Sequence, residues 1–262
     1  MALVAASSYK NVCMLGDIVH NEDVVRQMAE AGIKKIKRLG AGNRKMLLLR
    51  AHGATKETIR KIKRRGYELI DATCPMVKEI HTIALDMEKK CRRIIIIGDK
   101  NHDEVQGIIG QLKTKAIVID NLRDIPLKAV KKINKACVVA QSTQNIDEVL
   151  KIVEVLKKNI SHLEFFNTIC GPTRMKQREI RKMPRENDVM IIIGSKKSAN
   201  TKRLYEISRS LNPRSYWING KDEIKAGWVA KVKRVGVTAG ASTPESTIRE
   251  VVGYLKELSL SF

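Results

Sequence analysis

The run RIIIIG at residues 93–98 decides the fold class, because four consecutive isoleucines leave no alternation between polar and apolar side chains. A strand that is covered on both faces has this pattern, whereas a half-exposed strand alternates. The run DVMIIIG at residues 188–194 has the same character. Further apolar runs recur at NVCML (11–15), KMLLLR (45–50), YELIDA (67–72), KAIVID (115–120), ACVVA (136–140) and RVGVT (234–238), with weaker candidates at 164–168 and 214–218.

Segments with helical periodicity separate these strands. Each segment opens at a residue type that caps helix N-termini. The clearest capping candidates are Asn21, Thr55, Asp103, Ser198 and Thr243. Strands that alternate with helices form βαβ units, which place the strands in parallel sheets. The sequence therefore predicts an α/β fold with mostly parallel sheets.

The domain organisation is predicted from two unusual loops, since no low-complexity linker divides the chain. The loops are DATCP (71–75) and NTICGPT (167–173). Boundaries there give three small αβ domains at residues 1–74, 75–169 and 170–262. Each domain would hold a few βα units, and their polar loops would face one another around a central cleft.

Composition limits the class of protein. The chain has 262 residues, 43% of them hydrophobic, which suffices for a buried core. No apolar stretch approaches the roughly 20 residues that span a bilayer, and MALVAASSYK at the N-terminus does not resemble a secretory signal. The five cysteines form no CxxC pair, so we expect a reducing, cytoplasmic environment and no disulfide-built fold.

The formal net charge of +22 attracts phosphates, nucleic acid or acidic proteins without deciding among them. Basic runs such as KIKRRG (61–66) end helical segments, where cations also complement the helix dipole. Aromatic residues make up only 4% of the chain, few for stacking bases, and no nucleic-acid-binding motif is present. Nucleic-acid binding is therefore disfavoured but stays open as an alternative, and no membrane partner is expected.

Cys74 and Cys170 lie in the two unusual loops, each where an apolar run ends and an amphipathic run begins. Open α/β sheets present functional residues at such junctions. A packed cysteine usually lies within a strand or on a helix face, as we expect for Cys137. Junctions of the same kind hold three histidines and a carboxylate: His20, His52, His102 and Glu104. Each histidine alone is more often a hydrogen-bonded loop residue, but thiolates, imidazoles and a carboxylate together indicate a redox metal centre beside an anionic substrate.

The loops GSKKSANT (194–201) and TAGASTPE (238–245) each follow a strand and open a helix, as QSTQN (141–145) also does. Small residues let the backbone approach an anion, hydroxyl groups donate hydrogen bonds, and the helix N-terminus adds amides and a positive dipole. The alternative is that their Ser, Thr and Asn residues only cap helices. The recurrence of the pattern favours a bound anion. Glu104 could supply a proton to a leaving hydroxyl if a partner such as Ser142 lies near it; otherwise it is a first-turn carboxylate.

Taken together, DATCP, the VHN and AHG histidines, HDEV, NTIC, GSKKSAN and TAGASTPE closely resemble the 4-hydroxy-3-methylbut-2-enyl diphosphate reductases of the LytB/IspH family. The resemblance runs from about Leu15 to the C-terminus, with the motifs in family order. It implies three similar αβ domains around a central [4Fe–4S] cluster that three cysteines hold. It also implies reductive dehydroxylation of an allylic diphosphate to isopentenyl and dimethylallyl diphosphate, with a ferredoxin or flavodoxin as electron donor.

The motif matches imply roles for individual residues. Cys74 and Cys170 match two of the three cluster ligands, and Glu104 matches the carboxylate of a proton relay. Ser142 takes the place of a relay hydroxyl that is usually threonine, and Ala199 replaces a usual serine. The remaining matches bind substrate, either as histidines (His20, His52, His102) or at its diphosphate (Ser198, Asn200, Ser242).

The resemblance departs at the start of the chain. Members of the family begin with a strand, a Gly-rich loop with the first cluster cysteine and a long helix, and this unit is absent before VCMLGDIVHN. Either the chain is a truncated version with an incomplete first domain, or Cys13 has taken over the role. A mid-strand thiol is expected to point into packing, which disfavours Cys13. The alternative functions are a metal-free phosphate-substrate αβ enzyme, a basic nucleic-acid-binding protein and an inactive truncated reductase.

Overall fold

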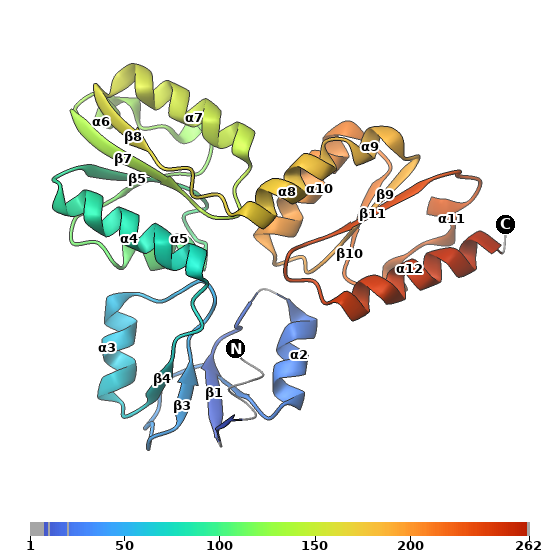
Figure 1. Cartoon of the computed structure of the whole chain (residues 1–262), viewed down its shortest axis with the longest axis horizontal. Helices are drawn as coiled ribbons and strands as arrows, with labels where there is room; N and C mark the ends of the chain where they lie inside the picture. The colour runs from blue at the N-terminus through green and yellow to red at the C-terminus, as the bar shows by residue number, and fades with distance from the viewer. Residues whose placement is uncertain (1–7, 10, 20, 261–262) are drawn as a thin grey trace. The chain divides into compact units, whose positions relative to one another are not determined.

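The computed structural model describes residues 8–9, 11–19 and 21–260. Within them the chain forms three parallel sheets joined by helices (Figure 1). This arrangement confirms the predicted α/β class. The chain divides into two compact units: the first holds residues 1–19 and 28–170, and the second holds residues 20–27 and 171–262.

The first sheet has the strand order β2-β1-β3-β4. Its core contains Cys13, Leu47 and Ile62. β2 was not predicted, because the exposed Lys34 and Lys35 interrupt any apolar run on this edge strand. The elements are β1 (Val12–Leu15), α2 (Glu22–Glu30), β2 (Lys34–Ile36), β3 (Met46–Leu48), α3 (Lys56–Arg64) and β4 (Glu68–Ile70).

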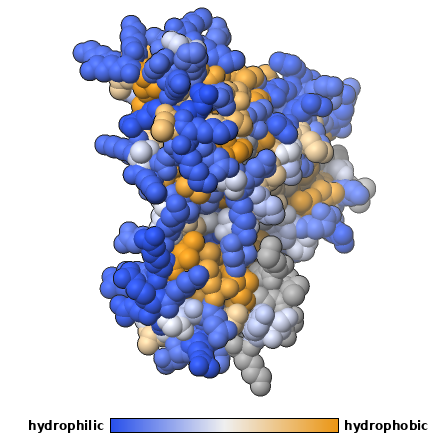
Figure 2. Space-filling view, turned by 60° about the vertical axis from the view of Figure 1, so that its left-hand side comes forward, coloured by the Kyte–Doolittle hydropathy of each residue, from blue (hydrophilic) through white to orange (hydrophobic). Residues whose placement is uncertain are grey.

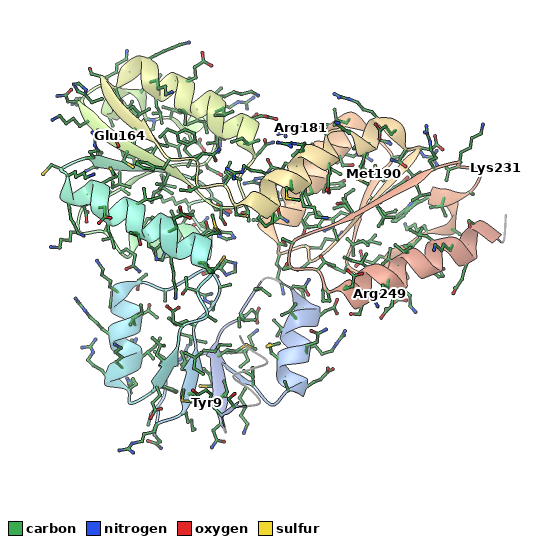
Figure 3. The ribbon with its side chains drawn as sticks, viewed as in Figure 1. Tyr9, Glu164, Arg181, Met190, Lys231 and Arg249 are labelled. Atoms are coloured by element: carbon green, nitrogen blue, oxygen red, sulfur yellow. The ribbon has the colours of Figure 1, made fainter. Side chains whose placement is uncertain are left out.

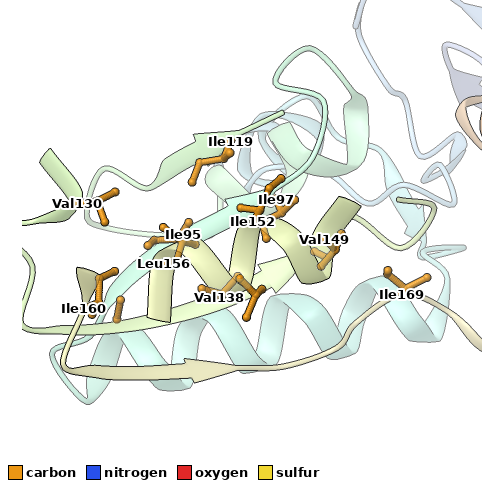
Figure 4. Packing of buried hydrophobic residues seen from close by; sticks show 13 residues of the cluster. Ile95, Ile97, Ile119, Val130, Val138, Val149, Ile152, Leu156, Ile160 and Ile169 are labelled. Atoms are coloured by element: carbon orange, nitrogen blue, oxygen red, sulfur yellow. The ribbon is translucent and has the colours of Figure 1, made fainter. Parts of the chain in front are cut away.

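The second sheet has the order β6-β5-β7-β8 and is covered on both faces. Ile95 and Ile97 of β5 pack in one cluster with residues of α7 (Figure 4), while Ile94 and Ile96 pack in another with residues of α4 and α5. The isoleucine run therefore serves both faces, as its lack of alternation predicts. The elements are α4 (Pro75–Lys89), β5 (Arg93–Ile97), α5 (Asp103–Ile109), β6 (Ile117–Ile119), η1 (Leu122–Asp124), α6 (Leu127–Val130), β7 (Lys135–Ala140), α7 (Ile146–Asn159) and β8 (His162–Phe165).

The third sheet has the order β10-β9-β11. Met190 (labelled in Figure 3) and Ile192 of β9 pack with residues of α8 and α10, and Ile191 packs in a separate cluster with Val251 of α12. This sheet too is covered on both faces. The elements are α8 (Gly171–Ile180), α9 (Met183–Glu186), β9 (Val189–Ile193), α10 (Ala199–Leu211), β10 (Ser215–Ile218), η2 (Lys221–Glu223), α11 (Ala226–Val229), β11 (Val235–Ala239) and α12 (Glu245–Leu260).

The strand order repeats from sheet to sheet. In each sheet the second strand in sequence lies outside the first, and the third lies on the other side of the first. One sheet falls within each of the predicted segments 1–74, 75–169 and 170–262. The two compact units do not separate the first two sheets, so the three-domain boundaries stay a prediction.

The predicted helix caps are only partly correct. Three predicted residues cap their helices with side-chain oxygens that accept backbone N–H groups: Asn21, Thr55 and Ser198. Asp103 is the first residue of α5 and not its cap, because His102 Nδ1 accepts the N–H of Glu104. Thr243 is not a cap either, since α12 begins two residues later and the Thr243 hydroxyl donates to a carbonyl of β9.

Hydrophilic side chains cover most of the molecular face in Figure 2, and hydrophobic residues show in the gaps between them. This distribution fits a chain with fifty basic and twenty-eight acidic residues. None of the helices among the described residues combines the length and apolar character that crossing a bilayer requires.

Candidate active site

The predicted site residues lie at the carboxyl ends of the strands. In the first unit His52 follows β3, Cys74 follows β4 and His102 follows β5, while Ser142 and Cys170 follow β7 and β8. The carboxyl ends of parallel strands share one edge of a sheet, where α/β folds bind their ligands. His20, which was also predicted, lies outside the residues that the structure describes.

The carboxyl edges of the first and second sheets meet within the first unit. Arg50 Nη1 and Asp103 Oδ2 form an ion pair at 2.6 Å. The rings of His52 and His102 are in edge-to-face contact, with 5.3 Å between centroids. The backbone N–H of Cys74 donates at 3.0 Å to the carbonyl of the residue before His52. The structure therefore brings together two of the three predicted site histidines and one predicted cysteine loop.

Glu104 and Ser142 form a buried pair in this region. Glu104 is only 2% exposed. Its Oε1 accepts the Ser142 backbone N–H at 2.6 Å, and its Oε2 accepts the Ser142 hydroxyl at 2.7 Å. Burial raises the pKa of the Glu104 carboxyl above its ordinary value of 4.5, and the hydrogen bonds from Ser142 oppose that rise. The pair can thus hold a proton at a carboxyl that water does not reach.

His102 has a defined tautomer in its neutral form. Its Nδ1 accepts the backbone N–H of Glu104 at 3.2 Å, so the ring proton lies on Nε2. A neutral imidazole of this kind donates a hydrogen bond from Nε2. The hydrogen bond at Nδ1 therefore makes the neutral His102 ring a donor at Nε2 and ties the ring to the backbone of Glu104.

The second unit carries the predicted anion-binding residues at the carboxyl edge of its sheet. Ser198 and Asn200 follow β9, and Ser242 follows β11, which pairs with β9 in parallel. The Ser198 hydroxyl oxygen accepts the Thr201 N–H at 3.3 Å. Asn200 is 5% exposed, and neither its Nδ2 nor its Oδ1 has a hydrogen-bond partner among the described residues. Buried polar groups are nearly always paired, so this amide is an exception among the buried side chains that the structure describes.

The two loops that hold these residues pack closely on each other. Gly194 has a φ of +144°, and a Cβ there would lie 2.7 Å from Thr201 Oγ1 and 2.8 Å from Thr243 Oγ1. Only glycine fits such a contact. The close approach joins the loop of Asn200 to the loop of Ser242, so both loops belong to one surface of the unit.

These motifs in this fold agree with a known family. The sequence profile of the LytB protein family matches residues 1–256. The chain belongs to this family. It is 38% identical to the 4-hydroxy-3-methylbut-2-enyl diphosphate reductase of Geobacter metallireducens over 259 residues, which cover 98% of this chain and 91% of that protein. The reductase of the same name from Aquifex aeolicus is 36% identical over 254 residues, 96% of this chain and 87% of that protein.

Solved structures of similar proteins share the fold. One is (E)-4-hydroxy-3-methyl-but-2-enyl diphosphate reductase, the terminal enzyme of the non-mevalonate pathway, with a TM-score of 0.71 and 35% identity over 98% of this chain and 92% of that chain. Another is the E-1-hydroxy-2-methyl-but-2-enyl-4-diphosphate reductase of Plasmodium falciparum, with a TM-score of 0.89 and 28% identity over 96% of this chain and 80% of that chain. The resemblance deduced from the motifs is thereby confirmed.

The iron–sulfur cluster that the LytB resemblance implies has a partial set of donors in this chain. Cys74 and Cys170 are half-buried at strand ends and in no disulfide, and the Cys170 N–H donates to the Ser142 carbonyl at 3.0 Å. These two cysteines fit the role of ligands. Among the described residues, no group of three or more His, Cys, Asp or Glu side chains is arranged to hold a metal ion.

The other three cysteines do not complete the set. Cys13 is 4% exposed in β1, and its Sγ donates to the Met46 carbonyl at 3.3 Å, while burial raises its pKa. This placement confirms that the mid-strand thiol points into packing. Cys137 is fully buried in β7, and burial raises its pKa to about 12. Cys91 is exposed, just beyond α4.

Sequence reasoning missed three residues at the meeting edges, namely Arg50, Asp103 and His81. Arg50 and Asp103 are separated by more than fifty positions, so their pairing has no local signal. His81 lies on α4 four residues after the buried Val77 and three before the buried Ala84. That spacing indicates a core-facing position, which was the one available signal. Burial lowers the pKa of the His81 imidazole to about 4, and Asp71 opposes the shift.

Proposed function

We propose that this LytB protein reduces 4-hydroxy-3-methylbut-2-enyl diphosphate to isopentenyl and dimethylallyl diphosphate. Relatives with the corresponding name match nearly the whole chain at 33–39% identity. The observation that carries the proposal is the buried Glu104–Ser142 pair. Removing an allylic hydroxyl as water requires a proton at that oxygen, and a carboxyl with a raised pKa beside a hydroxyl is suited to deliver one.

The anionic end of the substrate would bind in the second unit. The Asn200 Nδ2, which lacks a partner among the described residues, can donate to an anion, and Ser198 and Ser242 offer hydroxyls on the same sheet edge. The N-terminus of α10 adds backbone amides and a positive dipole. A diphosphate oxygen supplies the acceptors that such a site requires.

The hydroxyl end would bind at the edges that meet in the first unit. His102 donates from Nε2 because its Nδ1 is occupied by a backbone N–H. The ring of His52 contacts that of His102, so the two imidazoles would orient the same part of the substrate. Glu104 Oε2 and the Ser142 hydroxyl would exchange the proton that lets the substrate oxygen leave as water.

We further propose that Cys74 and Cys170 bind a [4Fe–4S] cluster. Such a cluster, when bound, supplies electrons one at a time and an iron that acts as a Lewis acid. Support comes from the position of both cysteines at strand ends, outside the packed cores. The remaining cysteines add no further ligand at these edges.

The electron donor would be a ferredoxin or flavodoxin. An acidic donor suits a protein with a formal net charge of +22, because complementary charge speeds encounter. All five cysteines are free thiols, which supports a reducing compartment such as the cytoplasm.

The test is anaerobic reconstitution with iron and sulfide, followed by an assay of allylic diphosphate reduction with a chemical reductant. Wild type should turn over substrate, whereas Cys74→Ser and Cys170→Ser should lose iron, sulfide and turnover together. Cys91→Ser is the matched control, because that thiol is exposed outside the site, and it should behave as wild type. Turnover that survives Cys74→Ser in an iron-free chain would instead identify a metal-free enzyme.

A further inference from the structure

His81 fills the space between two glycines of the first unit. A Cβ at Gly53 would lie 3.0 Å from His81 Cε1, and a Cβ at Gly107 would lie 3.5 Å from His81 Nε2. The Gly107 Cβ would also lie 3.1 Å from the carbonyl oxygen of His52. The imidazole therefore occupies the joint between the loop after β3 and helix α5. A methyl group at Gly53 would press on the ring, whereas one at Gly107 would press on the His52 carbonyl and only touch the ring.

The other contacts between this loop and α5 are weaker. The Arg50 and Asp103 side chains are each 31% exposed, so water screens part of their attraction. A cavity of about 80 Å³ is lined by residues of the same joint, among them Arg50, Gly53, Asp103 and Gly107. Packing between the loop and α5 is thus incomplete, and the half-buried ring of His81 has a larger share in fixing their separation.

We propose that His81 is a positioning residue: its imidazole sets the separation between the loop that carries His52 and the start of α5, which carries His102 and Glu104. The effect of His81 on turnover rests on the proposed function. Its effect on the placement of the two other imidazoles does not. The two consequences can therefore be measured separately on the full chain.

The chemistry of the ring suits this role. His81 Nε2 is buried without a hydrogen-bond partner among the described residues, and the ring is neutral at physiological pH because burial disfavours its charge. A neutral ring fills the joint without adding a charge to it. The proposed role depends on the size of the ring and not on its proton.

The experiment records nitrogen-15 and proton spectra of the five histidines in the full chain, before and after reconstitution, together with kcat and KM for the allylic diphosphate. In His81→Ala the ring signals of His52 and His102 should shift, and kcat/KM should fall by about 10- to 100-fold because small misplacements are costly. Free imidazole should restore part of the loss. Gly107→Ala, which presses a methyl group toward the His52 carbonyl, should shift the His52 signal as well.

His162→Ala is the matched control, since His162 is an exposed histidine on β8 that should leave both other signals and kcat/KM unchanged. Unshifted His52 and His102 signals in folded His81→Ala would overturn the proposal. If His81→Ala does not fold, unshifted His52 and His102 signals in His81→Gln, which also lacks the ring, would overturn it equally. Shifted signals in a chain whose wild type has no reductase turnover would uphold the positioning role and reject the proposed function instead.

Discussion

Glu104 in the first unit and Asn200 in the second are both buried polar side chains at the carboxyl ends of parallel strands, and they differ in how completely they are bonded. Both Glu104 oxygens accept hydrogen bonds from Ser142. Neither polar atom of the Asn200 side chain has a partner among the described residues. A buried polar group without a partner costs about 1–3 kcal/mol, so the second unit tolerates a cost that the first avoids.

The difference agrees with the roles proposed for the two side chains. A carboxyl that is fully bonded within the protein keeps its position whether or not substrate is bound. An amide without protein partners becomes satisfied only when a ligand arrives, so its cost is recovered as binding energy. The first arrangement suits proton transfer, and the second suits recognition of an anion.

The largest expected effect follows from removing the acid without changing its shape. Glu104→Gln can keep both contacts with Ser142, because the amide oxygen accepts the backbone N–H and the amide nitrogen donates to the hydroxyl oxygen. We expect kcat to fall by about 10²–10⁴-fold, the usual contribution of general acid catalysis. Substrate affinity, measured by calorimetry on the reconstituted protein, should change little.

Ser142 supplies the matched pair of controls for Glu104→Gln. Ser142→Thr keeps the hydroxyl that contacts Glu104 Oε2 and should retain most of the turnover, whereas Ser142→Ala removes it and should not. Unchanged turnover in Glu104→Gln would remove this carboxyl from the proton relay. The comparison with Asn200 would then lose its functional meaning.

A smaller effect, with opposite signs for stability and binding, is expected at Asn200. Asn200→Leu replaces unpaired polar atoms by an apolar side chain of similar size, so the ligand-free protein should gain about 1 kcal/mol in free energy of unfolding. Its affinity for inorganic diphosphate should fall by about tenfold for each hydrogen bond lost, roughly 1.4 kcal/mol. Chemical denaturation and calorimetry measure the two quantities.

Asn212 in the same unit is the control for Asn200. It is also buried, but its side-chain N–H groups donate to the carbonyls of Pro184 and Asn187 at 3.1 and 2.9 Å. Asn212→Leu leaves those carbonyls unpaired and should destabilise the protein by about 1–3 kcal/mol. Equal destabilisation by both substitutions would mean that the Asn200 side chain has hydrogen-bond partners in solution, and the contrast with Glu104 would then be wrong.

Local sequence patterns predicted most of the fold, because a parallel strand that is buried on both faces is a continuous run of apolar residues in the sequence. The runs at 93–98 and 188–194 became central strands covered on both faces. β2 was not predicted, because an edge strand of three residues with two exposed lysines has no apolar run. The cap of α5 was misassigned since a histidine took the capping role next to a more usual capping residue, Asp103.

The candidate site was predictable as a set of loops but not as a set of contacts. Residue types at strand ends singled out Cys74, His52 and Glu104. The bond from Ser142 to Glu104 joins residues 38 positions apart, and only tertiary packing creates it. The same holds for the ring of His81, whose role depends on two glycines in other elements.

The smallest expected effect is a pH dependence that separates the two buried groups. The Glu104 pKa is raised in the folded protein above its ordinary 4.5, so the folded state binds the proton more tightly than the unfolded state. The resulting stability is fully present below about pH 4.5 and is lost as the pH rises through the folded value. Relative to Glu104→Gln, wild type should therefore lose stability with rising pH, while Asn200→Leu should run parallel to wild type. Because turnover needs the same proton, kcat should decline only as the pH rises through the folded value, where the loss of stability levels off; a decline that begins near pH 4.5 would assign the proton to another group.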